Sequence, residues 1–500
     1  MPAESPVPVH VPSSKSVADN LTSQLAALVV WATSFTEDLA SFERDLLPRL
    51  WQLGVLLVQL MAMARQERLA AQTSTSVLHR IVRHVRTIVG VVCLVRLNFA
   101  GPHGGCRLDR ELGLVADRSQ AHLLERAVRL SGRMSFVEAQ DVLSWFVPEP
   151  PSIKAMQQAV LGLGAHAEAF FAEQPAPDDD GEVLVLVFDS KAIPTATERE
   201  LQRRRGSRTH KKKAPSPRHR GRDKRSSWGP RKRRRPGDKS KNGRIGTLVV
   251  MYTLQRKAGL LLGPLNKKIY ASMGPKEHAF VVARREATKR GFGPATRKVV
   301  QVVTDGDEDL AALTQKYFPN AKHTLDIMHA LEYVAQAGRA LHGTATAAFD
   351  TWFETQRTRL FDGDVEKILW EICQALESTP TRGPGNKARR TCLETALNYL
   401  EKRKEMMRYN ELAEADLELG SGAAEGAINH VMVQRFDHGG MRWIRERAQP
   451  LLQLRCIDRN GDWEAFLVWV KPKLAATPEG KLIRLQRASP APLPSLEKAA

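Results

Sequence analysis

The sequence predicts an α/β core of five mixed strands with flanking helices, interrupted by an all-α insertion and preceded by a mostly helical N-terminal domain. Three observations favour this fold class. Strand-like apolar runs cluster between residues 182 and 328, and helical periodicity dominates residues 17–72 and 340–418. A turn-forming segment, QPAPDDDG (174–181), separates the first helical region from the strands. Five hundred residues also exceed what one hydrophobic core usually covers.

The N-terminal third is predicted to be a leader followed by helices. Residues 1–16 lack the basic and apolar regions of a signal peptide, and we expect a disordered leader there. Residues 17–72 repeat apolar positions at helical spacing, which indicates a helical pair. After a short β-like stretch at 88–99, helical patterning returns, with Ser135 and Ser152 as expected N-caps. Residues 17–173 are therefore assigned to a mostly helical domain.

The predicted core spans residues 181–339. Its expected strands are 182–189, 246–255, 264–273, 298–305 and 321–328. Helices are expected at 276–290 and 308–317, and a last one begins near His329. This β-β-β-α-β-α-β-α order, with Asp189 and Asp305 ending the first and fourth strands, is that of RNase H-like folds. Strand ends are where such sheets place their chemistry.

The C-terminal third is predicted to be an insertion followed by the rest of the core. Residues 340–418 show only helical patterning, so an all-α insertion is expected there. The core resumes at 419–470, and 471–500 is expected to be a flexible tail. The most apolar run, 50–64, is shorter than the roughly 18 to 20 residues of a spanning helix, so no membrane partner is expected.

The net charge of +20 is concentrated in one segment. Residues 199–244 contain 21 Lys or Arg and three acids, so they carry +18 of that total. Such a segment cannot bury enough apolar surface to fold alone, and we expect a disordered basic loop that binds the phosphates of a polyanion. Its densest positions are the predicted DNA-binding residues Lys211, Lys212, Lys213, Arg231, Lys232, Arg233, Arg234 and Arg235.

Three carboxylates are the candidate catalytic residues. Asp189 and Asp305 each end a strand-like run, and adjacent parallel strands would bring them to one edge of the sheet. Glu425, in GSGAAEG, is expected in the first turns of a helix that Ser421 can cap. Phosphodiester cleavage by in-line displacement uses two metal ions, and Mg²⁺ prefers carboxylate oxygens. The expected cofactor is therefore Mg²⁺ or Mn²⁺, as two ions held by these three residues.

At these residues the chain resembles bacterial insertion-sequence transposases of the DDE type, most closely the ISKra group. The resemblance spans most of the chain and rests on several motifs in the same order. They are RTIVGVVCLVRLNF (86–99) with CRLDRELGL (106–114), SFVEAQDVLSWF (135–146), FDSKAIP (188–194), VTDGDEDL (303–310), FPNAKHTLDIMHALEYV (318–334), GSGAAEG (420–426) and GGMRWIRERAQPLLQLR (439–455).

The resemblance implies an activity and a set of residues. Asp189, Asp305 and Glu425 would be the catalytic triad for DNA strand cleavage and strand transfer. Asp326 and His329 match a DxxH pattern that supports the active site in several such groups. The implied partners are the element ends and target DNA, bound by a homo-oligomer in the bacterial cytoplasm at the nucleoid. The N-terminal domain would recognise the DNA ends.

Two alternatives share the same features. An RNase H-like nuclease or resolvase would use the same carboxylates without strand transfer. A non-catalytic DNA-binding derivative would keep the fold and coat DNA through its basic loop. For Asp326 and His329, the residues alone favour a functional role no more than a helix-capping aspartate and a structural histidine.

Overall fold

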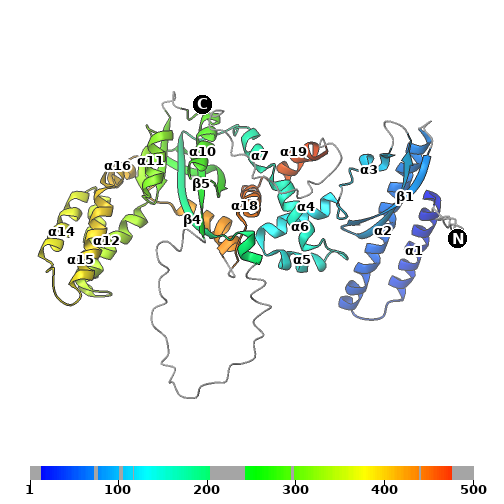
Figure 1. Ribbon diagram of the computed structural model, residues 1–500, viewed down its shortest axis with the longest axis horizontal. Helices are drawn as coiled ribbons and strands as arrows, with labels where there is room; N and C mark the ends of the chain where they lie inside the picture. The colour runs from blue at the N-terminus through cyan, green and yellow to red at the C-terminus, as the bar shows by residue number, and fades with distance from the viewer. Residues whose placement is uncertain are drawn as a thin grey trace, which may run out of the picture. The chain divides into compact units, whose positions relative to one another are not determined.

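The computed structural model describes residues 13–72, 77–100, 105–115, 117–202, 243–293, 298–437 and 441–475 (Figure 1). The chain divides into two compact units. Of the described residues, the first unit contains those in 13–166 and 464–475, and the second contains those in 167–463. The divisions at His166 and Trp463 differ from the predicted boundaries at 174–181 and 470.

The first unit begins with a helical hairpin. Helix α1 (Ser14–Ser34) is capped by the side chain of Ser13, and α2 (Leu39–Ala71) is capped by Asp38. An aromatic cluster at the turn is formed by Trp31, Phe35 and Phe42. The helical pair predicted in residues 17–72 is confirmed.

A three-stranded antiparallel sheet follows the hairpin. Its strands are β1 (Val77–Thr87), β2 (Gly90–Phe99) and β3 (Gly105–Cys106), in the order β1-β2-β3. Helices α2 and α3 (Arg107–Glu111) pack on it. The sequence reading expected strand only at 88–99 and missed β1. In VLHRIVRHVRT the apolar and basic residues occur in pairs, so β1 lacks the strict alternation that identifies a half-buried strand from sequence.

Three further helices complete the described N-terminal part of this unit. They are α4 (Ala121–Arg133), α5 (Phe136–Ser144) and α6 (Ile153–Gly164). Both predicted caps are confirmed: Ser135 forms a capping box with Glu138, and the Ser152 side chain accepts from a backbone N–H of α6. The buried core of these helices consists of Leu123, Ala127, Leu143, Val147 and Met156. Most of α19 (Trp463–Ala475) also belongs to this unit.

The second unit is built on a five-stranded mixed sheet. Its strands are β4 (Val183–Pro194), β5 (Gly243–Lys257), β6 (Leu260–Ser272), β7 (Val299–Thr304) and β8 (Lys322–Leu325). The order is β6-β5-β4-β7-β8; β4, β5 and β6 pair antiparallel, whereas β4, β7 and β8 pair parallel. The predicted mixed five-stranded sheet is confirmed. Strand β8 ends before the predicted residue 328, because Asp326 caps the next helix.

Helices cover both faces of this sheet. On one face α10 (Glu277–Lys289) stacks its Phe280 ring on Phe188 of β4, with centroids 3.8 Å apart. Side chains alternate along a strand, so Asp189 points to the opposite face. The elements α17 (Gly422–Ile428) and η2 (Asn429–Asp437) pack against β4 on that side.

In Figure 1 the helical insertion of the second unit lies to one side of the sheet, at the left of the view. Between the strands, α11 (Glu308–Tyr317) follows β7 and α12 (Ile327–His342) follows β8. Helix α7 (Ala167–Glu173) packs against α18 (Arg445–Arg459), which in turn packs on β6. The insertion contains only helices among its described elements: α13 (Ala347–Phe361), α14 (Val365–Ser378), α15 (Asn386–Glu401), η1 (Lys404–Met406) and α16 (Tyr409–Glu414).

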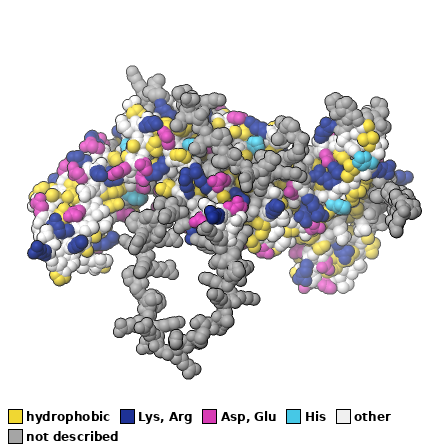
Figure 2. Space-filling view, viewed as in Figure 1, with side chains coloured by type: hydrophobic (Ala, Val, Ile, Leu, Met, Phe, Trp, Pro, Cys, Tyr) yellow, Lys and Arg dark blue, Asp and Glu magenta, His cyan; other side chains and the backbone are white. Residues whose placement is uncertain are grey.

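The described surface carries mixed charge. On the face in Figure 2, Lys and Arg side chains are interspersed with Asp and Glu. This agrees with a balance close to neutral outside residues 199–244.

One described helix, α2, is long and apolar enough to cross a membrane by length and composition alone. It contains 33 residues, so the apolar run at 50–64 belongs to a longer helix than the sequence argument assumed. A window of α2 has a mean hydropathy of 1.5, and 6% of that window is buried. A single helix of this kind is weak evidence for a membrane span, and it leaves the predicted absence of a membrane partner a prediction.

Candidate active site

Three aspartates lie in one row across the parallel half of the sheet. Strands β4 and β7 pair Val187 with Val303, and continuing this register by two residues places Asp189 beside Asp305. Strands β7 and β8 pair Thr304 with Leu325, so the next residues in register are Asp305 and Asp326. Because all three strands run in the same direction, the three carboxylates emerge at the same edge and on the same face.

Asp189 is a carboxylate that resists ionisation. Burial at the end of the apolar strand and the negative charges of Asp305 and Asp326 raise its pKa to about 6, although an N–H donated by Ser190 and the nearby His329 act the other way. No Lys or Arg of the described chain forms an ion pair with Asp189 or Asp305. A carboxylate pair without a cationic partner is a site that attracts a cation.

The loop after Asp305 is held by its own neighbours. Asp305 accepts a hydrogen bond from the Asp307 N–H at 2.9 Å, and Asp307 caps α11. Lys276, at the start of α10, donates to both oxygens of Asp307 at 2.6 and 2.7 Å. Within the acidic run DGDED, the charge of Asp307 is therefore neutralised by Lys276. Asp305 has no such ion pair with a Lys or Arg of the described chain.

Asp326 and His329, which lie one helical turn apart, form a hydrogen bond. His329 Nδ1 lies 3.0 Å from Asp326 Oδ2, and Asp326 also accepts from the Met328 N–H and the Ser421 hydroxyl. Burial alone would raise the pKa of Asp326, but these donors together lower it. The same hydrogen bond raises the pKa of His329, which the charge of Asp305 reinforces against burial. Asp326 is thus a buried anchor, and His329 is a partly exposed group close to the pair.

Glu425 occupies a different environment from the two strand-end aspartates. It lies in the first turn of α17, which packs on β4 and β5, and its side chain is exposed. Ser421 stands at the N-cap position as predicted, but its hydroxyl bonds Asp326 instead of capping the helix. Helix α17 continues into the π-helix η2, a rare element that is frequent at functional sites.

The side chains around Asp189 and Asp305 decide whether a divalent cation fits this site. Within the described ranges, no three His, Cys, Asp or Glu side chains are grouped closely enough to hold a metal ion. Asp189 and Asp305 by themselves fit Mg²⁺ or Mn²⁺, since they offer hard oxygen ligands from adjacent strand ends and form no ion pair with a Lys or Arg of the described chain. Glu425 does not join them in such a group.

The helical insertion supplies contacts that the sequence did not predict. Tyr399 of α15 donates its hydroxyl to the backbone oxygen of Asp305 at 2.7 Å, and its ring stacks on Tyr333 with centroids 3.6 Å apart. Arg403 donates to the backbone oxygen of Gly306 at 2.7 Å and lies over the Tyr399 ring. Helix α15 therefore ends against the loop that carries Asp305. These partners lie about 95 residues away, so no local signal could have found them.

The segment leading into α17 is held on the parallel strand ends. Gln301, fully buried on β7, donates to Glu418 O at 2.7 Å and accepts from Glu418 N at 3.0 Å. One step along, the Ile327 N–H donates to Leu419 O. The one sequence signal was a Gln inside an otherwise apolar strand, KVVQVVTD.

The basic residues predicted to bind DNA lie outside the described residues. These are Lys211, Lys212, Lys213, Arg231, Lys232, Arg233, Arg234 and Arg235. Their prediction stands on sequence alone. The strands on either side of the segment pair up to its border, where Pro194 of β4 lies opposite Gly243 of β5.

Comparison with known proteins adds little to this geometry. No family model matches the chain, and no curated protein matches it in sequence. Among solved structures, it is similar to the Drosophila P element transposase strand transfer complex, with a TM-score of 0.27 and 10% sequence identity over 71% of this chain and 92% of that chain. A likeness of this size carries no argument, so the function is inferred from the chain's own residues.

Proposed function

We propose that the chain is a DDE-type DNA transposase of a bacterial insertion sequence, with an RNase H-like core. The observation that carries the proposal is the shared register of Asp189 and Asp305 at the ends of adjacent parallel strands. The strand and helix order and the position of Glu425 on the covering helix α17 support it. Placement in the ISKra group rests on the motifs quoted from the sequence.

The proposed chemistry assigns a role to each residue. Mg²⁺ or Mn²⁺, as two ions, would be held by Asp189, Asp305 and Glu425 and would supply activation of a nucleophilic water or 3′-hydroxyl and stabilisation of the leaving oxygen. Asp189 must be ionised to hold a cation, and with a pKa of about 6 most of it is ionised at neutral pH. Glu425 is exposed, so its side chain has freedom to reorient towards the pair.

The supporting residues act through charge and position. Asp326 keeps His329 oriented and favours its protonated form, so His329 presents positive charge next to Asp189 and Asp305. A DNA phosphate entering this edge would meet that charge. The proposed partners are the element ends and target DNA, bound by a homo-oligomer in the cytoplasm at the nucleoid.

The proposal is tested by removing one carboxylate at a time. Asp189→Ala, Asp305→Ala and Glu425→Ala should each abolish Mg²⁺-dependent cleavage of a plasmid carrying the DNA that flanks the reading frame, while DNA binding is retained. Glu182→Gln, at the start of β4, is the control that should leave cleavage intact. Full activity in all three Ala variants would overturn the assignment.

The products distinguish transposition from simple cleavage. Sequencing should find target DNA joined to the element ends, because the freed 3′-hydroxyl attacks the target. Products that are only nicked or resolved would favour a nuclease or resolvase with the same residues. DNA binding without any cleavage would favour a non-catalytic derivative.

A further inference from the structure

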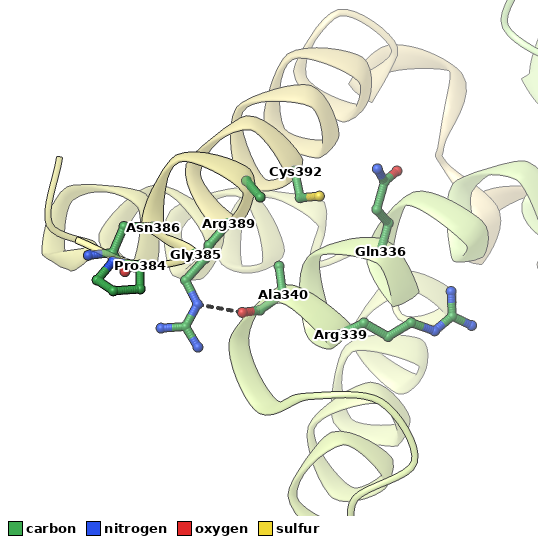
Figure 3. Close-up of a pocket in the computed structure, with 9 residues that line it drawn as sticks. Gln336, Arg339, Ala340, Pro384, Gly385, Asn386, Arg389 and Cys392 are labelled. Carbon is green, nitrogen blue, oxygen red and sulfur yellow. Dashed lines mark hydrogen bonds between the residues drawn. The ribbon is translucent and has the colours of Figure 1, made fainter. Parts of the chain in front are cut away.

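A groove in the helical insertion is lined by basic and polar side chains. It has a volume of about 630 Å³ and lies between α12 and α15, which pack side by side (Figure 3). Helix α12 contributes Gln336 and Arg339, and α15 contributes Asn386, Ala388 and Arg389. Of the nine residues that line the groove, all within the described chain, none is acidic.

The positive charge of the groove is not cancelled nearby. In the described chain, Arg339 forms no ion pair; its guanidinium lies 5.7 Å from the centroid of the Phe349 ring. Arg389 donates to the backbone oxygens of Ala340 and Leu341, which fixes it without neutralising it. Between Glu377 and Glu394 the sequence contains four Lys or Arg and no acid.

The arrangement of the two arginines favours an extended ligand. Figure 3 shows the Arg339 and Arg389 side chains on opposite sides of Ala340 rather than converging on one point. A compact free anion is held best by groups that converge on it, whereas a row of phosphates is contacted by cations spread along a groove. The groove also faces solvent, since Ala388 and both arginines are exposed.

We infer that this groove binds the phosphate backbone of DNA, an inference that rests on the proposed function. Helix α15 links the groove to the site, because its opposite end holds the loop of Asp305 through Tyr399. Its 16 residues span about 24 Å at about 1.5 Å per residue. With about 3.4 Å of DNA helix axis per base pair, the contact falls about seven base pairs from the cut.

Two substitutions remove the contact without touching the active site. Arg339→Gln deletes an exposed charge, and Ala388→Glu places a carboxylate in the groove at a helix start, where an acid is tolerated. Arg357→Gln is the matched control, since Arg357 is an exposed arginine of the same insertion on α13 and pairs only with Glu354 among the described residues. Thermal melts of the full-length variants check that all three fold.

The measurement is the affinity of the full-length chain for a DNA duplex of about 30 base pairs over a range of salt. Arg339→Gln should make the negative slope of log K against log salt less steep by about 0.9. Ala388→Glu should weaken binding by about tenfold or more at low salt. Arg357→Gln should stay within about twofold of the parent chain. If both groove variants behave as Arg357→Gln does, the inference is overturned.

Two further experiments distinguish a DNA phosphate from a free phosphate ion as the ligand of the groove. They also separate this inference from the proposed function. Inorganic phosphate at constant ionic strength should not compete with DNA; competition that Arg339→Gln abolishes would indicate a small-anion site and overturn the DNA assignment. Ethylation of phosphates about seven base pairs from the cut should interfere with binding of the parent chain and not of Ala388→Glu. Loss of cleavage in Asp189→Ala with unchanged groove effects would leave the two proposals independent.

Discussion

Asp189 combines two effects that oppose ionisation, burial and the charges of Asp305 and Asp326. Its pKa of about 6 in the folded chain lies above the ordinary value of 3.8. The folded state therefore binds more protons than the unfolded state between these pH values. Stability from this group is fully present below pH 3.8 and is lost as the pH rises through about 6. Above that pH, an ionised Asp189 without metal destabilises the fold.

Asp189→Asn should consequently stabilise the metal-free chain at pH 7. One pKa unit corresponds to about 1.4 kcal/mol, and with screening by solvent we expect a gain of about 1 to 2 kcal/mol. The gain should vanish below pH 4. Denaturant unfolding in EDTA at both pH values measures it, with Glu182→Gln, just before the same strand, as a control. A variant less stable than the parent at pH 7 would contradict this account.

Gln301 is a second residue whose burial determines how much stability a substitution costs. Its amide makes three hydrogen bonds, to Thr324 and to both backbone groups of Glu418. Gln301→Leu would fill similar volume but leave these partners unsatisfied, at a cost of about 1 to 3 kcal/mol each where they stay dry. We expect a total loss of about 2 to 4 kcal/mol by denaturant unfolding.

The same variant should loosen the segment that leads into α17. Hydrogen exchange should rise at residues 418–421 relative to the parent chain. Gln374→Leu, on the exposed side of α14, is the control and should change stability by less than about 0.5 kcal/mol. Unchanged exchange at 418–421 would show that Gln301 does not hold this segment.

At the scale of elements, the end of α15 contacts the loop that carries Asp305. Gly306 has φ of +79°, and a Cβ there would lie 2.5 Å from Arg403 Nε and 2.8 Å from a Leu325 methyl. Arg403 has little freedom to withdraw, because it bonds Gly306 O and lies over the Tyr399 ring. The insertion and the Asp305 loop are therefore fitted to each other without a side chain at 306.

Comparing Gly306→Ala with Gly461→Ala separates the close contact with Arg403 from ordinary backbone strain. Gly461 has φ of +80° with open space around its Cβ position, so Gly461→Ala measures the strain alone, about 1 to 2 kcal/mol. Gly306→Ala should cost at least about 1 kcal/mol more in denaturant unfolding and should also lower the cleavage rate. Equal costs for the two variants would rule out the close contact with Arg403.

At the scale of the whole molecule, charge and chemistry are separated along the chain. Residues 203–242 contain 19 Lys or Arg and two acids, whereas the described surface is mixed. Attraction to DNA over a distance should therefore depend on that segment, and cleavage should depend on the strand-end carboxylates.

Replacing residues 203–242 with a short Gly/Ser linker tests this separation. The linker should be tolerated, because the flanking strands β4 and β5 already pair at Pro194 and Gly243. We expect the DNA association rate to fall by about tenfold or more at low salt, with cleavage of bound DNA retained. Stopped-flow binding and single-turnover cleavage measure the two steps. A chain that binds normally but no longer cleaves would reverse the assignment.

The sequence by itself determined the sheet and the two strand-end aspartates, because strand patterns and turns are local and parallel strand ends meet at one edge. It also placed Asp326 and His329 one helical turn apart, but it left their roles open. It missed β1, whose basic residues obscured an edge strand.

Only the tertiary structure decided how buried each carboxylate is and which partners it has. Asp189, Asp305 and Asp326 share one register row, yet Asp326 is buried under Ser421 and His329, while the other two form no ion pair with a Lys or Arg of the described chain. Tyr399, Arg403 and Gln301 likewise act through contacts between residues far apart in the sequence. Burial and partner choice depend on which distant segments pack together, and no local pattern encodes that.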